Sequence, residues 1–409
     1  MVSLAWIKRL VFLIVLIGLF SATNKAVERW QNETSALRAD VLALQERAAE
    51  QSDPHAAAQW QREADLRAAS IPSLASVRWT RVGGAAFLYA LGLMPAGLVL
   101  HRCLRAFAVN CTHRRALAAQ LLGHLGKYIP GKAMVVFLRI DAVLPKTQHA
   151  AAAQPLDKTL LDKSEVPAPD EESPRAKRPI GRVATCVFFE TLLMMGVGGA
   201  LAGVLLWNSD LPAWVRWFAA ATAIGSAIPV CPPVLRRLVE FVAARRRIKE
   251  ARRPGEAEPH EKPAGNSAAD TSSEPVDTKS QDDSTAPITW TLLGGCYLIS
   301  LVSWLMIGLS FAVLITAIPS FEPIPSMTRL IPMATAAISL GMVIGFASLL
   351  PGGAGVREYV TLLVLMPVIG ETQALLAVIA ARLMFIAVET LLAGLAALYL
   401  HMLQPLPHG

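Results

Sequence analysis

The chain has 409 residues, of which 54% are hydrophobic and 17% are charged, and its formal net charge is +7. Soluble domains carry about 25% charged residues, so this composition excludes an ordinary soluble protein. Long apolar runs predict an all-α, polytopic membrane protein instead. The five cysteines and eight histidines are scattered without ligand spacing. We therefore expect no metal site, no disulfide framework and no cofactor.

The N-terminal region combines an apolar run with a polar helical segment. Residues 1–23 contain the run Leu4–Ala22, in which Lys8 and Arg9 precede the apolar core Leu10–Phe20, and are predicted to be an uncleaved membrane anchor. A signal peptide has the same pattern and remains the alternative. Residues 24–81 carry a helical seam of apolar and small residues, spaced alternately by three and four: Val27, Trp30, Thr34, Leu37, Val41 and Leu44. This seam packs on the protein itself, lies on the membrane surface, or joins a partner in a coiled coil.

The remaining apolar runs predict a bundle of about seven or eight membrane segments, two of them broken. Beyond the first span, they are Val82–Leu100, Val183–Trp207, Trp214–Leu235, Ile288–Ile318, Leu330–Leu350, the short Tyr359–Ile369, and Ala374–Leu400. These runs divide the chain into 82–144 (a span and the first break), 181–235 (two spans) and 288–409 (the C-terminal spans with the second break). Between them, 145–180 and 236–287 contain few large apolar residues and are predicted to be disordered linkers, the second with a basic start.

The charge of the loops predicts the orientation. Residues 24–81 hold eight Lys and Arg against eight Asp and Glu, whereas residues 101–182 hold fourteen against seven. Because cytoplasmic loops are enriched in Lys and Arg, we expect 101–182 and 236–287 to be cytoplasmic and 24–81 to lie outside. The N-terminus is then cytoplasmic. The C-terminal tail has no Lys or Arg and stays unassigned.

Two Pro-Gly breaks interrupt apolar sequence and carry charge. The first is Leu125-Gly-Lys-Tyr-Ile-Pro-Gly-Lys132, and the second is Leu350-Pro-Gly-Gly-Ala-Gly-Val-Arg-Glu358. Irregular backbone at membrane depth survives only inside the protein or along a wet cavity. Each break is either an ordinary turn at a helix end or a helix N-terminus that faces an anion. Paired interruptions in two halves of a chain are typical of transporter binding sites.

Ionisable residues near or within apolar sequence are the candidates for function, because a charge in hydrocarbon is costly. Arg382 and Glu389 are seven residues apart on one helical face, too far to pair directly, so each needs another partner. Glu190 could pair with Arg382 or Arg139. The charges form either buried ion pairs that hold helices together or a cavity for an anionic head group. The predicted head-group site comprises Lys127, Tyr128, Pro130, Gly131, Lys132, Arg139, Pro351, Gly352, Gly353, Gly355, Arg357, Glu358 and Arg382, with Glu190 and Glu389 as charge partners.

At these motifs the chain resembles the flippase-like family of lysylphosphatidylglycerol synthase transmembrane regions, also called uncharacterised protein family 0104. The resemblance rests on Gly126–Lys132 with Arg139, on Glu190 within a span, on Pro351–Glu358, and on Arg382 and Glu389 in the last helix. It implies translocation of an anionic or polyprenyl-linked lipid in the inner membrane of a bacterial cell. Full-length synthases carry a soluble aminoacyl-transferase domain after the membrane part, and this sequence ends at Gly409. We therefore expect no lysyl transfer.

The sequence thus predicts a flippase-like translocator rather than an enzyme, since it contains no recognisable catalytic motif. Its expected partner is membrane lipid, without nucleic acid, and protein partners on either side of the membrane remain open. A membrane scaffold that recruits partners through basic cytoplasmic loops is the alternative. An intramembrane lipid-modifying enzyme is the third reading. A hydrated, charged cavity would favour transport, and a dry interior with every charge paired would favour the scaffold.

Overall fold

The computed structural model describes residues 34–71, 76–128, 133–144, 178–231, 289–320, 323–348, 350 and 353–403, with a few isolated positions besides. Within these residues all regular structure is helical, which confirms the all-α prediction. The first apolar run, Leu4–Ala22, lies outside the described residues, as do most of the two predicted linkers.

In the part of the chain that the structure describes, five helices are long and apolar enough to cross a membrane: α3 (Trp79–Ala106), α7 (Arg178–Trp207), α10 (Trp290–Ile315), α11 (Met327–Ala347) and α13 (Glu371–Met402). The shortest has 21 residues, which at 1.5 Å per residue matches a hydrocarbon core about 30 Å thick. They coincide with five of the predicted spans. The protein is therefore a multi-pass integral membrane protein.

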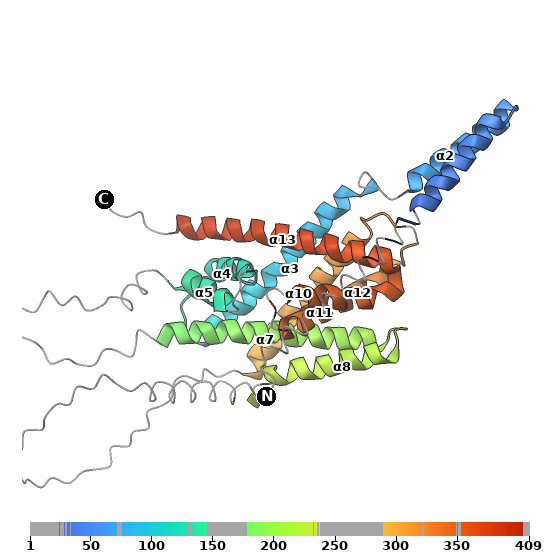
Figure 1. Cartoon of the computed structure of the whole chain (residues 1–409). Coiled ribbons are helices and arrows are strands. Elements are labelled where there is room, and N and C mark those ends of the chain that lie inside the picture. The colour runs from blue at the N-terminus through green and yellow to red at the C-terminus, as the bar shows by residue number, and fades with distance from the viewer. Residues whose placement is uncertain are drawn as a thin grey trace, which may run out of the picture.

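The two ends of the bundle differ in what is attached to them. At one end, Arg78 N donates to Ala317 O (2.9 Å), Gln373 Nε2 to Ile315 O (3.3 Å) and Arg329 Nη2 to Asp210 Oδ2 (3.2 Å). These contacts gather the start of α3, the end of α10 and the starts of α11 and α13, and we call this the arm end. The opposite end, where α7 and α10 begin, is called the linker end, because these helices follow the two predicted linkers in the sequence. Helix α13 finishes there, away from the arm (Figure 1).

A two-helix arm extends from the arm end (Figure 1, blue). It consists of a helix over 34–50 and α2 (Pro54–Ser70), whose N-terminus is capped by Asp53. Arg67 Nη1 pairs with Asp40 Oδ2 at 2.9 Å across the two helices. Val41 and Leu44 of the predicted seam are buried. The described part of the seam thus packs on this protein, as the first of its three alternatives states.

Several helices are too short to cross a membrane alone. Helix α4 (His113–Gly126) starts just after α3 ends, and α5 (Ala133–Val143) returns to the linker end, where Arg115 Nε donates to Ala142 O at 2.8 Å. Helix α12 (Val356–Ile369) returns from the end of α11 to the arm end. Helices α4 and α5 form a first hairpin, which begins and ends at the linker end. Helices α11 and α12 form a second hairpin, which begins and ends at the arm end. Their 14-residue helices α4 and α12 reach about 20 Å into the bundle.

Helix α8 (Ala213–Ala227) is shorter than the predicted span Trp214–Leu235. It passes into a 3₁₀ turn, η3 (Ile228–Val230). Pro229 lacks the amide hydrogen that an α-helix needs at that position, which explains the change of helix type. The 15 residues of α8 cover only about 22 Å.

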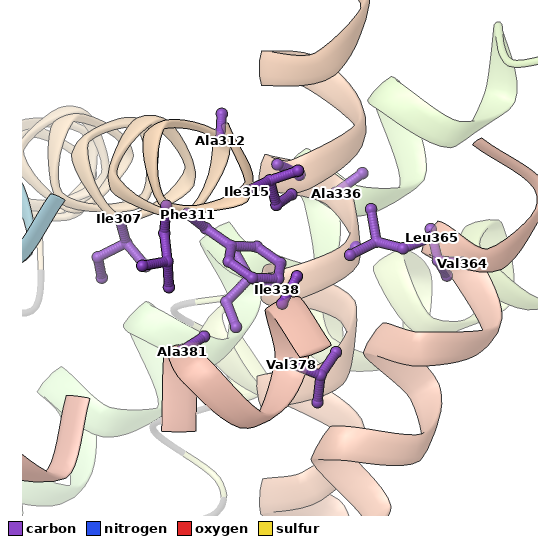
Figure 2. Packing of buried hydrophobic residues seen from close by; sticks show 14 of the residues in the cluster. Ile307, Phe311, Ala312, Ile315, Ala336, Ile338, Val364, Leu365, Val378 and Ala381 are labelled. Atoms are coloured by element: carbon purple, nitrogen blue, oxygen red, sulfur yellow. The ribbon is translucent and has the colours of Figure 1, made fainter. Parts of the chain in front are cut away.

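The bundle is held together by apolar packing and by small polar contacts between helices. Figure 2 shows Phe311 of α10 packed among side chains of α11, α12 and α13. Between α3 and α10, Ser310 Oγ donates to Ala85 O at 2.7 Å, and Ser303 donates to Gly92 O. Small residues let these backbones approach closely, which is the usual way helices associate in membranes.

Exposed tryptophans mark both membrane interfaces. Trp79, Trp207 and Trp214 are exposed at the arm end, and Trp290 is exposed at the linker end. Tryptophan concentrates at the head-group level of a bilayer. These side chains therefore indicate where the two head-group layers lie.

Candidate functional site

The tip of the α4–α5 hairpin is bound to the middle of α13 through Glu389. Lys127 Nζ lies 2.5 Å from Glu389 Oε1, and Tyr128 OH donates to Oε2 at 2.5 Å. Tyr89 of α3 donates a further hydrogen bond to Oε1. The carboxylate is buried and receives three donors, one of them charged. Glu389 thus has the partner that the sequence required, and it joins three segments far apart in the chain.

The second tip opens helix α12 with two glycines in the left-handed region, Gly353 (φ 65°) and Gly355 (φ 81°). A Cβ on Gly353 would lie 2.9 Å from Gly345 Cα of α11, so the turn needs glycine for space as well as for conformation. The Gly355 amide donates to Glu358 Oε2 at 2.8 Å. The protein's own carboxylate therefore caps this helix N-terminus. One of the two sequence-based alternatives has an external anion in that place.

Two arginines share the other oxygen of that carboxylate. Arg357 Nη2 and Arg382 Nη1 lie 3.4 and 3.6 Å from Glu358 Oε1. These distances are too long for strong hydrogen bonds, and neither Glu358 Oε1 nor Arg382 Nη1 has a hydrogen-bond partner among the described residues. A cavity of about 10 Å³ adjoins them, roughly the room that one water molecule needs.

The two tips meet. The Arg382 guanidinium lies 5.3 Å from the centre of the Tyr128 ring, a cation–π contact between α13 and the first tip. Arg357 lies 5.9 Å from the Phe385 ring, which stacks on Tyr89 at 3.9 Å. These contacts define one group of side chains within the helical bundle, here called the central cluster: Tyr89, Lys127, Tyr128, Arg357, Glu358, Arg382, Phe385 and Glu389.

The central cluster has an excess of positive charge. Three cations (Lys127, Arg357 and Arg382) face two carboxylates (Glu358 and Glu389), which leaves +1 among the described members with all groups ionised. An uncompensated charge at membrane depth is costly. The excess positive charge of the central cluster favours the binding of an anion.

A second buried group stabilises the first hairpin from its other side. Arg139 Nη1 of α5 pairs with Glu190 Oε2 of α7 at 2.7 Å, and Gln120 Nε2 of α4 donates to Glu190 Oε1 at 3.0 Å. The Arg139 side chain passes over Gly123, where any Cβ would collide with it. Of the two partners that the sequence allows for Glu190, Arg139 is the one that forms the ion pair. Arg382 pairs with Glu358 instead.

The structure brings most of the predicted site residues together but divides them by role. Lys127, Tyr128, Arg357, Glu358 and Arg382 join the central cluster, and Gly353 and Gly355 shape its second tip. Arg139 belongs to the separate ion pair. The remaining predicted residues lie outside the described part of the chain: Pro130, Gly131, Lys132, Pro351 and Gly352.

Tyr89, Gln120 and Phe385 were missed by sequence reasoning. Tyr89 is a lone phenol in an apolar span and Phe385 is one apolar residue among many, so neither has a sequence signal. Gln120 lies in a segment that the charge pattern assigns to a loop. Recognising α4 as membrane-inserted would have drawn attention to this amide.

Helix lengths, interfacial tryptophans and charged hairpin tips define a polytopic helical membrane protein with a polar centre. The family described as the lysylphosphatidylglycerol synthase TM region matches residues 174–393 of the chain. The match covers more than half of the sequence, and the chain belongs to this family. It includes Glu190, the second break, Arg382 and Glu389, whereas the first break precedes it. No curated protein matches the chain.

Proposed function

We propose that this protein translocates an anionic lipid, either a phospholipid or a polyprenyl-linked lipid, between the leaflets of the membrane. The observation that carries the proposal is that two hairpin tips from opposite ends of the bundle contribute charged residues to one cluster around α13, which has net positive charge. Phosphate is the group that both lipid classes share and that arginine and lysine bind best. The role is one of transport rather than catalysis.

The arrangement of partners suggests how a phosphate would be received. Arg357 and Arg382 already share one carboxylate oxygen at long range, so each retains hydrogen-bonding capacity for an incoming phosphate. The cavity beside them has room for about one water molecule, so admission of a head group requires the tips to separate. If a lipid phosphate replaced the Glu389 carboxylate as the partner of Lys127, the first tip would be released from α13.

The finer topology belongs to the same proposal. Counting the first apolar run, α8 and α12 beside the five long helices gives eight membrane segments, and in this proposal both Pro-Gly breaks lie at membrane depth. Because residues 101–182 and the run 236–253 are rich in Lys and Arg, the linker end is cytoplasmic in this proposal, and the protein lies in the inner membrane. The C-terminus then lies on the cytoplasmic side, because α13 finishes at the linker end (Figure 1).

Reconstitution tests translocation directly. The purified protein is placed in vesicles that contain phosphatidylglycerol with a fluorescent tail label, and a membrane-impermeant quencher is added outside. Quenching beyond the outer-leaflet half in protein-containing vesicles supports the proposal, and quenching equal to that of protein-free vesicles contradicts it. Arg382→Gln should slow the quenching of lipid that starts in the inner leaflet, whereas Arg62→Gln on the exposed arm should not. Mass spectrometry of co-purified lipid identifies the native ligand class.

A scaffold without transport activity is the second candidate. The observation in its favour is the pairing of Lys127 and Arg139 with internal carboxylates at 2.5 and 2.7 Å. In that case protein partners would bind the basic loops of the linker end. Equal quenching in both vesicle preparations, together with partners retained by the wild-type protein and lost on removal of 236–287, would favour this function.

A further inference from the structure

A second cavity lies at the arm end, far from the central cluster along the bundle axis. Its volume is about 380 Å³, which is within the usual range of small-molecule sites. The loop between α7 and α8, the first turns of α11 and the last turn of α12 form its walls. None of these residues takes part in the central cluster.

The walls of this cavity are apolar on the membrane side and charged at the rim. Val204, Leu205, Met333 and Val368 form the apolar part. At the rim, Arg329 Nη2 lies 3.2 Å from Asp210 Oδ2, and both side chains are largely exposed, by 63% and 92%. Asn208 adds a neutral polar group. The cavity is therefore amphiphilic, with one charge of each sign at its mouth.

The depth of the cavity matches the head-group layer of the bilayer. Val204 and Leu205 lie in the last turn of α7, immediately before the exposed Trp207, which contacts Trp217 edge to face. Tryptophans at this position mark the membrane interface. An amphiphile in the adjoining leaflet would therefore present its polar head at the level of Asp210 and Arg329.

We infer that this cavity binds the head group of a zwitterionic lipid that carries both a phosphate and an amine. An anionic ligand at Arg329 would displace Asp210 and leave it without a partner, and a cationic ligand would do the same to Arg329. A zwitterion pairs with both, its phosphate with Arg329 and its ammonium with Asp210. Because exposed ion pairs contribute little to stability, separating these two side chains costs little. The lipid's apolar part lies against Val204 and Leu205.

Binding measurements on the full-length protein in detergent micelles test this inference without requiring transport. Native mass spectrometry compares short-chain phosphatidylethanolamine, short-chain phosphatidylglycerol and free phosphoethanolamine. We expect the ethanolamine lipid to bind about two- to fivefold more tightly than the glycerol lipid, because it gains one further exposed ion pair, with Asp210. Free phosphoethanolamine should bind at least tenfold more weakly than the lipid, because it lacks the apolar contacts.

Two single-charge variants provide the sharper test, because they should shift selectivity in opposite directions. Asp210→Asn leaves Arg329 unpaired and should favour phosphatidylglycerol. Arg329→Gln leaves Asp210 unpaired and should weaken both phospholipids, while binding of a cationic amphiphile increases. Asp65→Asn and Arg62→Gln on the exposed arm repeat the charge changes elsewhere and should leave all affinities unchanged.

Equal affinity of the two phospholipids for the wild-type protein would overturn the inference. So would shifts of selectivity in the same direction for both variants. Equal binding of free phosphoethanolamine would overturn the assignment to a lipid. Each of these results leaves the translocation assay unaffected, since that assay depends on the central cluster.

Discussion

The Glu389 carboxylate of α13 lies 2.5 Å from the Lys127 ammonium at the tip of the α4–α5 hairpin. The two residues are 262 positions apart in the sequence. Their contact fixes the end of α4 against the middle of α13. The contact holds the first tip against α13, the helix that also carries Arg382, the partner of Glu358 at the second tip.

Breaking the Arg139–Glu190 pair should destabilise the fold. Arg139→Gln leaves a buried carboxylate without its cation and should lower the free energy of unfolding by about 3–5 kcal/mol. Addition of Glu190→Gln should recover most of the loss. Thermal unfolding in detergent measures both. Arg67→Gln, which breaks an exposed pair, should cost no more than about 1 kcal/mol. Wild-type stability of Arg139→Gln would show that the pair has no structural role.

Arg357→Gln should weaken the binding of anionic lipid while leaving the fold largely intact. Its interaction with Glu358, at 3.4 Å, is long, and Arg382 remains beside that carboxylate. Arg382→Lys should be partly defective as well, because lysine cannot reproduce the two-pronged contact of a guanidinium with phosphate. The measurement is thermal stability beside the amount of retained lipid. Loss of stability that Glu358→Gln reverses would assign both arginines to structure alone.

Tyr89→Phe should loosen the first hairpin tip without removing a charge. Glu389 loses one of its three donors, and a buried acceptor that loses a hydrogen bond costs about 1–3 kcal/mol. Tyr297→Phe is the matched control, because this partly exposed tyrosine of α10 has no hydrogen bond that its hydroxyl could lose among the described contacts. The two variants are compared by thermal unfolding, and equal stability would mean that the Tyr89 hydroxyl contributes nothing.

Gly353→Ala should be destabilising, and Gly394→Ala should not. Alanine at φ 65° is strained by about 1–2 kcal/mol, and its Cβ would also press on Gly345. Gly394 lies within α13 with no atom near the position of a Cβ, so alanine there should stabilise the helix by about 0.5–1 kcal/mol. Opposite shifts in melting temperature are expected. A neutral Gly353→Ala would mean that the turn can adopt another conformation.

Cysteine labelling of intact cells tests the orientation. In a background without the native cysteines, Ser52→Cys on the arm should react with an impermeant reagent added outside, whereas Ser173→Cys should react only after the membrane is opened. The physical reason is the excess of Lys and Arg in 101–182 over 24–81. A reactive Ser173→Cys in intact cells would reverse the assignment.

Much of the fold follows from properties that are local in the sequence. An apolar run long enough to cross the membrane must satisfy its backbone hydrogen bonds internally, so it is helical wherever it packs. For this reason α3, α7, α10, α11 and α13 lie where the hydrophobicity predicts them. Proline and glycine likewise mark the breaks through their own backbone geometry, as Gly353 and Gly355 demonstrate.

The pairing of charges was decided by tertiary structure alone. The sequence shows that Glu389 needs a cation, but Lys127, Arg139, Arg357 and Arg382 have the same chemistry, and hydrophobic patterns carry no information about which of them lies nearby. Likewise, the sequence of α4 has the pattern of a basic loop, because the charge of its first turn is more prominent than its short apolar stretch. Only packing against α3 and α13 makes it a membrane hairpin, since burial by neighbouring helices is a property of the assembled bundle.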